Sequence, residues 1–532
     1  MKAIVTPALG PRVLLLALVS CSSSFATSGH DGGSDAGDAG DAGVITIPAG
    51  DGAASDASSS DASSSDASSG DASSTDAGCS PPTTLACGGQ CVDPSGPAHC
   101  GACDNECPAP AAGTGNATCM DGACGVTCNA GYAVYGSDCL VTDLYVDVAT
   151  GSNGNPGTLS APLKTITHAL ALAQGSMTVH VFAGTYSEGS ASGPGLGIVD
   201  AVTVESYGTG TVIVAGPAAL DAGYSYGFSI ADSGTLRGVT IQGYDEPIAV
   251  SGSGSALLDS VNTVNNTSYI SLTGTGTLTA VDSQLGPVGV AGVVGSTATF
   301  VMQSGTLAGT GTCAPGEGLP PLQMWGGSAV LTGVTVDVSG PGEMWTSGSL
   351  AMTSATITGP TCEGQPAILI GQGGAVELTD TSVPGGINNA GILTMHGGSI
   401  AGTDNPAVAC SSSTTGELPA LVMRDVTVTV PAGGPGLLLE GPGAYDLGTS
   451  YSPGGNTFST GGNAFSATRG AIAATSAGIT LTASGNTWIA GVQGANASGQ
   501  MVAGTSVTGP LACPVNTACN FNLAGATDSI TF

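Results

Sequence analysis

Four hexapeptides within residues 236–307 recur at intervals of 22 residues. They read LRGVTI, LDSVNT, AVDSQL and MQSGTL, and they begin at Leu236, Leu258, Ala280 and Met302. In each, an apolar residue is followed by Gly, Ser or Asp two positions later and by a polar residue four positions later. Alternation with a period of two is typical of a β-strand, and Gly, Ser and Asp favour turns. The interval predicts a stack of similar coils.

The same template fits nine times. Its first positions, all apolar, are Leu236, Leu258, Ala280, Met302, Leu331, Met352, Leu378, Met395 and Met423. Two residues later stand Gly238, Ser260, Asp282, Ser304, Gly333, Ser354, Asp380, Gly397 and Asp425. Four residues later the chain has Thr240, Asn262, Gln284, Thr306, Thr335, Thr356, Ser382, Ser399 and Thr427. The fifth following position is aliphatic except at Thr263, and holds Ile241, Thr263, Leu285, Leu307, Val336, Ile357, Val383, Ile400 and Val428.

This template predicts an all-β parallel β-helix, in which each coil covers the unpaired strand edges of its neighbour. The alternative is an antiparallel sandwich with strands at regular spacing. A sandwich does not keep one turn column in register through nine repeats, so the β-helix is favoured.

A single helix is expected near the start of this region, at residues 165–173. Ile166, Ala169, Leu170 and Ala173 share one helical face there, between strand patterns at residues 144–148 and 178–182. A stack of coils needs a cover over its first exposed edge. We therefore expect the helix to cap the solenoid.

The motifs around this helix read YVD, NPGT, APLKTIT and GTYSE. They resemble the start of the pectate-lyase-like right-handed parallel β-helix family of uncharacterised bacterial surface proteins. The matching residues are Tyr145, Val146, Asp147, Asn155, Pro156, Gly157, Thr158, Pro162, Lys164, Thr165, Ile166, Ala169, Leu170, Gly184, Thr185, Tyr186 and Glu188. The segments DLGTSYSPGGNTF (446–458) and ASGNTW (483–488) also look like this family. The resemblance covers roughly residues 143–499 and implies a fold but no established reaction.

Ten cysteines lie between Cys79 and Cys139. CGGQCVDPSGPAHCGACDNEC (87–107) resembles the cysteine-rich modules of bacterial surface proteins and plant stigma-specific proteins, with His99 in place of the usual Asn. Residues 119–139 look like half of an EGF-like unit. Zinc is the alternative, since Cys100 and Cys103 have ligand spacing, but an even count in an exported chain favours disulfides. We expect disulfides among Cys79, Cys87, Cys91, Cys100, Cys103, Cys107, Cys119, Cys124, Cys128 and Cys139.

Five further cysteines follow later in the chain. Cys513 and Cys519 flank a short loop and are expected to pair. Cys313, Cys362 and Cys410 are expected in loops after the repeat strands, where two could bridge neighbouring coils. Without Cys21 the count is odd, so one thiol is expected to be free.

The amino terminus has the pattern of an export leader. Lys2 and Arg12 precede the apolar run VLLLALV, which is too short to span a bilayer, and the sequence LVSC then ends at Cys21. This resembles a bacterial lipobox, in which the cysteine becomes lipidated, and Ser22 after it favours the outer membrane by resemblance to Gram-negative lipoproteins. An ordinary leader with a chance cysteine is the alternative.

We expect four segments along the chain. Residues 1–20 form a lipoprotein signal peptide, and residues 21–78 form a disordered tether of DAG and DASSS repeats that cannot bury enough apolar area to fold. Residues 79–140 form the disulfide module, and residues 141–532 form the β-helix.

The balance of charge excludes some partners. The chain has 6 Lys and Arg against 38 Asp and Glu, a net charge of −32. Such a surface repels nucleic acid, anionic lipid headgroups and acidic polysaccharides. No metal or cofactor is expected; Ca²⁺ is conceivable but no motif supports it.

Candidate catalytic residues are few. Positions directly after the template's first residue should face solvent in one column, and this column holds His396 and Arg424, with Asp380 and Asp425 at adjacent turns. A His, an Arg and two carboxylates are chemically able to bind or cleave a sugar acid, but an ordinary polar face with Asp380 and Asp425 as turn formers is favoured. Trp325, Trp345 and Trp488 are candidates for stacking on sugars, and covering the solenoid end or a loop explains each of them equally.

The sequence therefore predicts a lipid-anchored periplasmic or cell-surface β-helix with a non-enzymatic binding, adhesive or structural role, with carbohydrate as one candidate ligand. The alternative is a polysaccharide lyase or glycoside hydrolase acting on the lateral face of the solenoid. The expected partners are the membrane, through the lipid, and a polysaccharide or other cell-surface ligand. The oligomeric state is left open.

Lipidation at Cys21 gives a direct test. Replacing the thiol in Cys21→Ser removes the atom that carries the lipid, so we expect the protein to move from the membrane to the soluble fraction. Detergent phase partitioning of cell extracts measures this, with Ser22→Ala as the matched control. Unchanged partitioning of Cys21→Ser would contradict the lipoprotein assignment.

Overall fold

The structure is a computed structural model. The chain divides into two units, residues 1–74 and 75–532. The structure describes Cys79 and residues 84–189, 195–216, 225–286, 290–294, 297–309, 319–338, 343–359, 365–402, 406–411, 417–431, 435–449, 451–459, 472–474, 479–487, 494–495, 501–502, 519–521 and 530–531. No helix among these residues is long and apolar enough to cross a membrane. The expected leader, Cys21 and the tether lie outside the described residues, as does Cys513.

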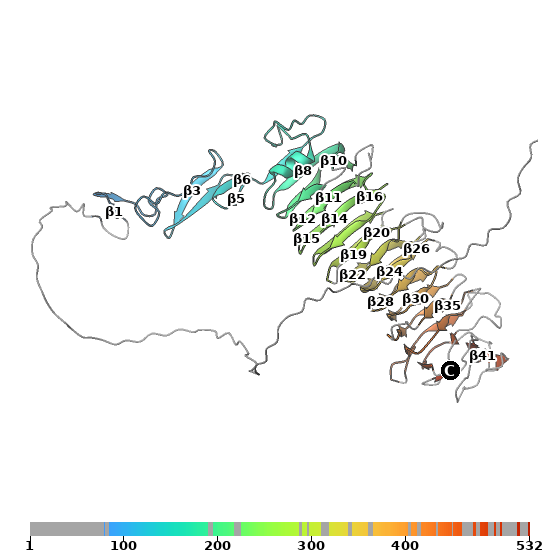
Figure 1. Ribbon diagram of the computed structural model, residues 1–532. Helices are drawn as coiled ribbons and strands as arrows, with labels where there is room; N and C mark the ends of the chain where they lie inside the picture. The colour runs from blue at the N-terminus through green and yellow to red at the C-terminus, as the bar shows by residue number, and fades with distance from the viewer. Residues whose placement is uncertain are drawn as a thin grey trace, which may run out of the picture. The chain divides into compact units, whose positions relative to one another are not determined.

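The large body is a parallel β-helix whose coils follow one another along its axis (Figure 1). Each regular coil contributes one strand to each of three faces. The first face contains β7 (Asp143–Val146), β12 (Gly234–Arg237), β15 (Ser255–Asp259), β22 (Ser328–Thr332), β25 (Ser349–Thr353), β28 (Ala375–Thr379), β31 (Ile392–His396), β34 (Ala420–Arg424), β37 (Ala444–Asp446) and β40 (Thr480–Thr482).

The second face follows the first after a sharp turn. It contains β13 (Val239–Gln242), β16 (Asn262–Val264), β23 (Thr335–Asp337), β26 (Thr356–Thr358), β29 (Ser382–Pro384), β32 (Ser399–Ala401), β35 (Thr427–Thr429) and β38 (Thr457–Ser459). Four longer strands run over both faces: β8 (Thr178–Ser187), β10 (Val202–Ala215), β18 (Thr277–Leu285) and β20 (Thr299–Ala308).

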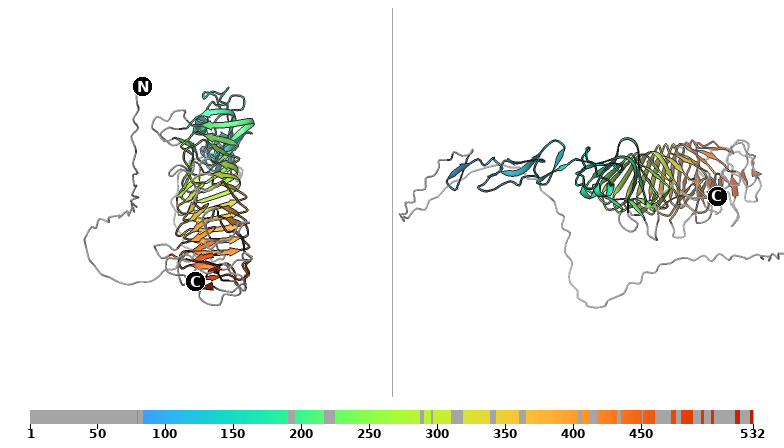
Figure 2. Two further views of the ribbon diagram at one scale, coloured as in Figure 1. Left: turned by 90° about the vertical axis from the view of Figure 1, so that its right-hand side faces the viewer. Right: turned by 90° about the horizontal axis from the view of Figure 1, so that it is seen from above.

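The third face is a separate sheet of 13 strands. Its parallel strands are β9 (Leu196–Ile198), β11 (Tyr226–Ile230), β14 (Glu246–Val250), β17 (Ile270–Thr273), β19 (Val290–Val294), β21 (Leu322–Met324), β24 (Met344–Thr346), β27 (Ile368–Ile370), β30 (Ile387–Asn389), β33 (Val408–Cys410), β36 (Leu437–Leu439) and β39 (Ile472–Ala474). At the carboxyl end, β43 (Cys519–Phe521) pairs antiparallel with β39, β44 (Ile530–Thr531) pairs antiparallel with β40, and β41 (Gly494–Ala495) pairs with β42 (Met501–Val502). Two further views show the coils stacked side by side (Figure 2).

The column of turn residues explains how the first face bends into the second. All nine residues at this position have a left-handed backbone, with φ between 47° and 72°. Gly reaches this region without steric cost, and Asp and Ser are short polar residues that tolerate it better than bulky ones. The predicted turn column is therefore confirmed at every repeat.

The core is a set of apolar columns inside the solenoid. The nine template residues that begin each repeat are at most 1% exposed, and each pairs in register with the next coil's equivalent. The fifth following position is also buried throughout, and Thr263, its polar exception, is fully buried. The Thr263 hydroxyl oxygen accepts a hydrogen bond from the Gly286 backbone N–H at 3.0 Å, which offsets the cost of burying that oxygen.

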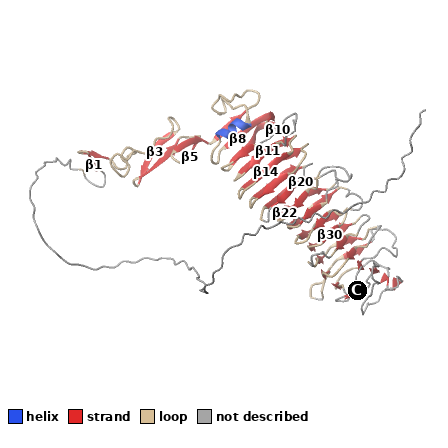
Figure 3. Cartoon of the chain, in the orientation of Figure 1, coloured by secondary structure: helices blue, strands red, loops and turns tan. Residues whose placement is uncertain are grey.

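The single helix of the described chain, α1 (Ile166–Leu172), lies over the first coils as predicted (Figure 3). Thr165 caps it by accepting a hydrogen bond from the His168 backbone N–H. The Glu188 carboxylate accepts two more, from the backbone N–H groups of Ile166 at 2.7 Å and Thr167 at 2.6 Å. Helix starts leave such donors unpaired, so the last residue of the GTYSE motif fixes the cap onto the next coil.

Two asparagines close the carboxyl-terminal coils. Asn456 is fully buried, and its side chain accepts from the Val426 N–H at 2.9 Å and donates to the Met423 carbonyl oxygen at 3.0 Å and to Asn486 at 2.8 Å. The repeated GNT in GGNTF and ASGNTW is thus a hydrogen-bonded pair stacked between coils.

The cysteine-rich segment consists of three hairpins. They pair β1 (Leu85–Cys87) with β2 (Gln90–Val92), β3 (Gly115–Met120) with β4 (Ala123–Cys128), and β5 (Tyr132–Tyr135) with β6 (Asp138–Val141). Gly88 and Gly89 form the first turn with φ of 57° and 86°, which explains the CGGQC motif because such turns need positive φ.

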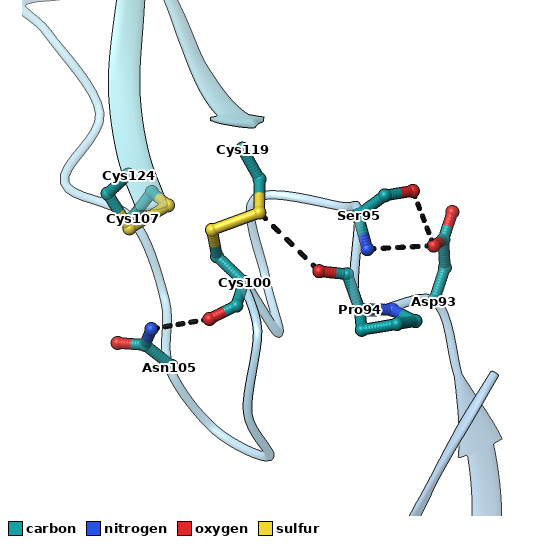
Figure 4. The surroundings of a disulfide bond; sticks show 8 residues. All are labelled: Asp93, Pro94, Ser95, Cys100, Asn105, Cys107, Cys119 and Cys124. Carbon is teal, nitrogen blue, oxygen red and sulfur yellow. Dashed lines mark hydrogen bonds between the residues drawn. A yellow bond between two sulfur atoms is a disulfide. The ribbon is translucent and has the colours of Figure 1, made fainter. Parts of the chain in front are cut away.

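The disulfides expected from the even count are present in this segment. Five bonds join Cys79–Cys91, Cys87–Cys103, Cys100–Cys119, Cys107–Cys124 and Cys128–Cys139. Figure 4 shows the Cys100–Cys119 bond, with the Asn105 amide donating to the Cys100 carbonyl oxygen at 2.5 Å.

Cys410 was expected in a loop, but it lies in a strand. It is the last residue of β33, fully buried and free, and its side chain belongs to the apolar core of the solenoid. Burial raises the pKa of its thiol to about 12, so it stays protonated and unreactive at neutral pH. Cys313 and Cys362 lie outside the described residues.

Leu331 tests the inward and outward register. It is fully buried, and it pairs with Met302 on one side and Met352 on the other. Truncation in Leu331→Ala loses both transfer energy and packing, so we expect a loss of about 2–5 kcal/mol in the free energy of unfolding. The outward Thr335→Ala, on the same coil, should change it by less than about 0.5 kcal/mol.

Hydrogen exchange identifies the coils that Leu331→Ala destabilises. Because coils contact only their neighbours, exchange should rise first at residues 300–360, while β8 stays protected. Equal effects of Leu331→Ala and Thr335→Ala would contradict the register.

Candidate functional site

The predicted cluster lies at β28, β31 and β34. His396 and Arg424 are in-register neighbours on adjacent coils, and His396 is exposed. Asp380 and Asp425 occupy the left-handed turns that follow their strands, with φ of 49° and 57°. A side chain at Gly397 would collide with the Asp380 carboxylate, and one at Gly455 with that of Asp425. Both carboxylates therefore lie over glycines of the next coil.

Arg424 does not bind these two aspartates. Its Nη2 donates to Asp446 at 2.7 Å, its Nη1 to the carbonyl oxygens of Met423 and Asp446 at 2.8 and 3.1 Å, and its Nε to the Ser452 hydroxyl at 3.3 Å. The guanidinium thus faces the next coil towards the carboxyl end. The structure brings His396 beside Arg424 but leaves Asp380 and Asp425 as turn formers.

The Asp446 carboxyl is tuned by this contact. Partial burial opposes its ionisation, but hydrogen bonds from Arg424, from Thr482 and from the Gly448 N–H, with the Arg424 charge, hold its pKa below the ordinary value of 3.8. Asp446 is therefore ionised at neutral pH, and it joins the coils on either side of it.

A second cluster lies at the other end of the solenoid and was not found by sequence reasoning. We call it the charge ladder, and its members are Asp143, His180, Glu205, Arg237 and Asp259. His180 Nε2 is 2.9 Å from Asp143, and its Nδ1 is 3.0 Å from Glu205, without hydrogen-bond geometry at that nitrogen. Arg237 follows, 3.1 Å from Glu205 and 2.9 Å from Asp259.

The ladder is a consequence of strand register. His180, Glu205, Arg237 and Asp259 pair directly from coil to coil. Partial burial opposes ionisation of Asp143, but hydrogen bonds from Thr142 and His180 lower its pKa below 3.8. A hydrogen bond to Asp259, the largest effect, and the contact with Glu205 raise the pKa of Arg237 above its ordinary value.

Aromatic rings surround the histidine. Tyr145 stacks on His180 with ring centroids 4.8 Å apart, and Tyr207 meets both rings edge-on at 5.3 and 5.2 Å. Phe182 contacts Tyr207 at 5.1 Å. The rings pack around His180, which is largely buried, while Arg237 at the other end of the ladder stays about half exposed.

The sequence did carry a signal for this ladder. Arg237 and Asp259 stand directly after template residues Leu236 and Leu258, the same column position that contains His396 and Arg424. The positions between them in the column hold Val281, Gln303, Thr332, Thr353 and Thr379. Extending the column to the longer coils before Leu236 would have found His180 and Glu205.

The adjacent carboxyls of Asp245 and Glu246 do not act as a pair. Asp245 accepts from the Ser225 N–H at 2.8 Å and from the Thr267 hydroxyl at 2.5 Å. Glu246 starts β14 and accepts from the Ser271 hydroxyl, and burial raises its pKa. Each carboxyl accepts hydrogen bonds from a neighbouring coil, so both have a structural role.

Trp325 and Trp345 contact each other on the third face. Their ring centroids are 4.4 Å apart and their planes are tilted by 60°. Trp325 is 59% exposed. Trp488 lies outside the described residues.

Possible metal donors cluster at one place in the described chain. The sulfur atoms of Cys100, Cys107 and Cys124 lie within 4.8 Å of one another. All three belong to disulfides, and metal binding requires thiolates. The zinc alternative for this segment therefore does not fit the bonds observed.

Comparison with known proteins finds a family match over part of the chain. Residues 149–315 match the family model described as Protein of unknown function (DUF1565). No curated protein matches the chain. Among solved structures, pectate lyase Pel9A has 15% identity and a TM-score of 0.30, covering 53% of this chain and 79% of its own. A rhamnogalacturonan lyase has 12% identity and a TM-score of 0.20, covering 61% and 75%.

Asp446 gives a pH-dependent prediction. Its folded-state pKa is lowered, so its contribution to stability is present above about pH 3.8 and is lost as the pH falls through the lower folded value. We expect Asp446→Asn to be less stable than wild type at pH 7, with a difference that shrinks below pH 3.8. Hydrogen exchange at residues 420–482, at pH 7 and pH 3, measures this difference.

Asp380→Asn is the matched control, since Asn also tolerates a left-handed turn and Asp380 lies at a turn and not in an ion pair. A difference between Asp446→Asn and wild type that is unchanged from pH 7 to pH 3 would contradict the assigned role.

Proposed function

We propose that this protein is a lipid-anchored β-helix of the outer membrane that acts by binding or as a structural element, without catalysis. The leader pattern supports the anchor, and the DAG and DASSS repeats support a spacer between membrane and solenoid. About 50 flexible residues would hold the folded part roughly 40 Å from its anchor.

The main support for a non-enzymatic role is that both arginines of the first face, Arg237 and Arg424, are held by contacts with acceptor groups. A lyase of this architecture would use a basic side chain to abstract a proton, and the base must be free of its own proton. Arg237 contacts two carboxylates, and Arg424 contacts one carboxylate and two carbonyl oxygens. The contacts with Asp259 and Glu205 raise the pKa of Arg237, which makes it a poor base, and the contacts of Arg424 hold its guanidinium on the next coil.

The surface between them also supports a passive role. The middle of the column carries a valine, a glutamine and three threonines, which are not acids or bases at neutral pH. A glycoside hydrolase needs two carboxyl groups facing each other across the scissile bond. The ladder carboxylates of Glu205 and Asp259 instead contact Arg237 between them, and Asp143 contacts His180.

An activity panel separates this proposal from the alternative. We expect wild-type protein to form neither unsaturated product nor reducing ends from pectin, alginate or neutral glycans, with or without added Ca²⁺, while it binds intact cell envelopes. Product that disappears in Arg237→Ala or Arg424→Ala would support the lyase alternative. Thr353→Ala, on the same face, is the control for non-specific loss.

A further inference from the structure

The two contacting tryptophans occupy the outward side of the third face. Gln323 of β21 pairs in register with Trp345 of β24, and Trp325 follows two residues after Gln323. Inward residues Met324 and Met344 are buried, which places Gln323, Trp325 and Trp345 on the solvent side of alternating strands. The rings are therefore diagonal neighbours across adjacent coils, a geometry in which large side chains reach each other.

The next coil leaves room for the second ring. A side chain added at Gly371 would come within 3.6 Å of the Trp345 indole nitrogen, so this ring extends over the bare backbone of the following coil. Neighbouring strands lie about 4.8 Å apart. The two rings thus form a stripe along the axis of the solenoid, which we call the tryptophan platform.

One ring of the pair is exposed to solvent and the other is half-buried. The chain has only 3 tryptophans in 532 residues, and two of them touch each other on the outside. A large aromatic side chain that is 59% exposed forgoes the free energy of burial unless it contacts a ligand.

We infer that the tryptophan platform binds a neutral polysaccharide, an inference that rests on the proposed function and names its ligand class. The flat, hydroxyl-rimmed rings of neutral sugars offer C–H faces for indole stacking and hydroxyl groups for polar neighbours such as Gln323. The net charge of −32 repels acidic polymers, which leaves neutral chains as the sugars that approach without cost.

The size of the patch argues against a protein partner or a second copy. Two aromatic side chains supply at most about 500 Å², whereas a stable protein interface buries roughly 800 Å² on each partner. In the outward column of this face, Trp345 is followed by Leu369, and this apolar pair lies between the polar residues Gln323 and Asn388. A polysaccharide chain needs a narrow stripe with polar borders, and the platform has that form.

Affinity electrophoresis of the full chain tests this inference. The probes are four neutral polymers, hydroxyethyl cellulose, mixed-linkage β-glucan, galactomannan and dextran, with polygalacturonate and alginate as anionic ones. We expect at least one neutral polymer to retard wild type, and Trp325→Ala and Trp345→Ala to weaken that binding at least about tenfold. Trp325→Phe should recover most of it, because an aromatic face is restored.

Tyr451→Ala is the matched control, since Tyr451 is an aromatic side chain that is 98% exposed on another loop. Unchanged hydrogen exchange of the core in each variant shows that folding is retained. Trp325 is the more exposed ring, so Trp325→Ala decides the result if Trp345→Ala disturbs the coil.

Several results would overturn the platform. They are retardation by anionic polymers alone or by none, a Trp325→Ala variant that binds like wild type, an equal loss in Tyr451→Ala, or a Trp325-dependent dimer. The proposed function fails separately, through sugar products in the activity panel or failure to bind cell envelopes. If envelope binding does not depend on Trp325, the inference about the platform is wrong but the proposed function still holds.

Discussion

The structure depends on one constraint: a coil can hide its apolar residues only by stacking on another coil in register. A single coil of this chain has no interior of its own, because each strand points one residue inward and the next outward. Stacking aligns Leu331 between Met302 and Met352 and pairs the backbone groups of all three strands. Burial and hydrogen bonding are thus satisfied by the same step, repeated along the axis.

The left-handed turn makes this stacking repeatable. One residue with positive φ separates the first face from the second in each regular coil, so the two strands keep the same angle from coil to coil. Insertions lie in the connections before and after the third strand, as between β32 and β33 and between β33 and β34, which explains why the repeat interval varies from 17 to 29 residues while the columns stay aligned. The first and last coils each have one face without a neighbouring coil. At the amino-terminal end α1 covers it, and Thr165 and Glu188 accept hydrogen bonds from the start of this helix.

Much of this fold could be predicted from the sequence, because the residues that determine it recur at short, regular intervals. The template gave the core column, the turn column and the polar column, and the helical face of Ile166 and Ala169 gave the cap. The charge ladder was missed because Asp143, His180 and Glu205 belong to longer, irregular coils before the first clean repeat, where the interval cannot be counted. The contacts of the Arg424 guanidinium could not be predicted either. The repeat places the backbone of Arg424, but its hydrogen bond to Asp446 determines the orientation of the side chain.

Register also limits where charge can be placed. Each outward residue lies about 4.8 Å from its equivalents on the two adjacent coils, a separation at which like charges repel by about 1 kcal/mol even in water. The first-face column avoids this cost where its acids gather, because Arg237 lies between Glu205 and Asp259. The other outward column of this face never has two acids as neighbours, and it runs Asp143, Thr178, Thr203, Thr235, Leu257, Thr279, Val301, Val330, Ala351, Glu377, Thr394, Val422 and Asp446.

The turn column follows the same rule, since Asp282 has serines on both sides and Asp380 and Asp425 each lie over a glycine. With very few cations available, an acidic chain that folds in this way must fill most of its outward positions with uncharged residues, such as the threonines and valines of this face. The small share of charged residues, 8%, agrees with this limit of the fold's register. Arg237 then separates the carboxylates of Glu205 and Asp259, and Arg424 holds Asp446 of the next coil.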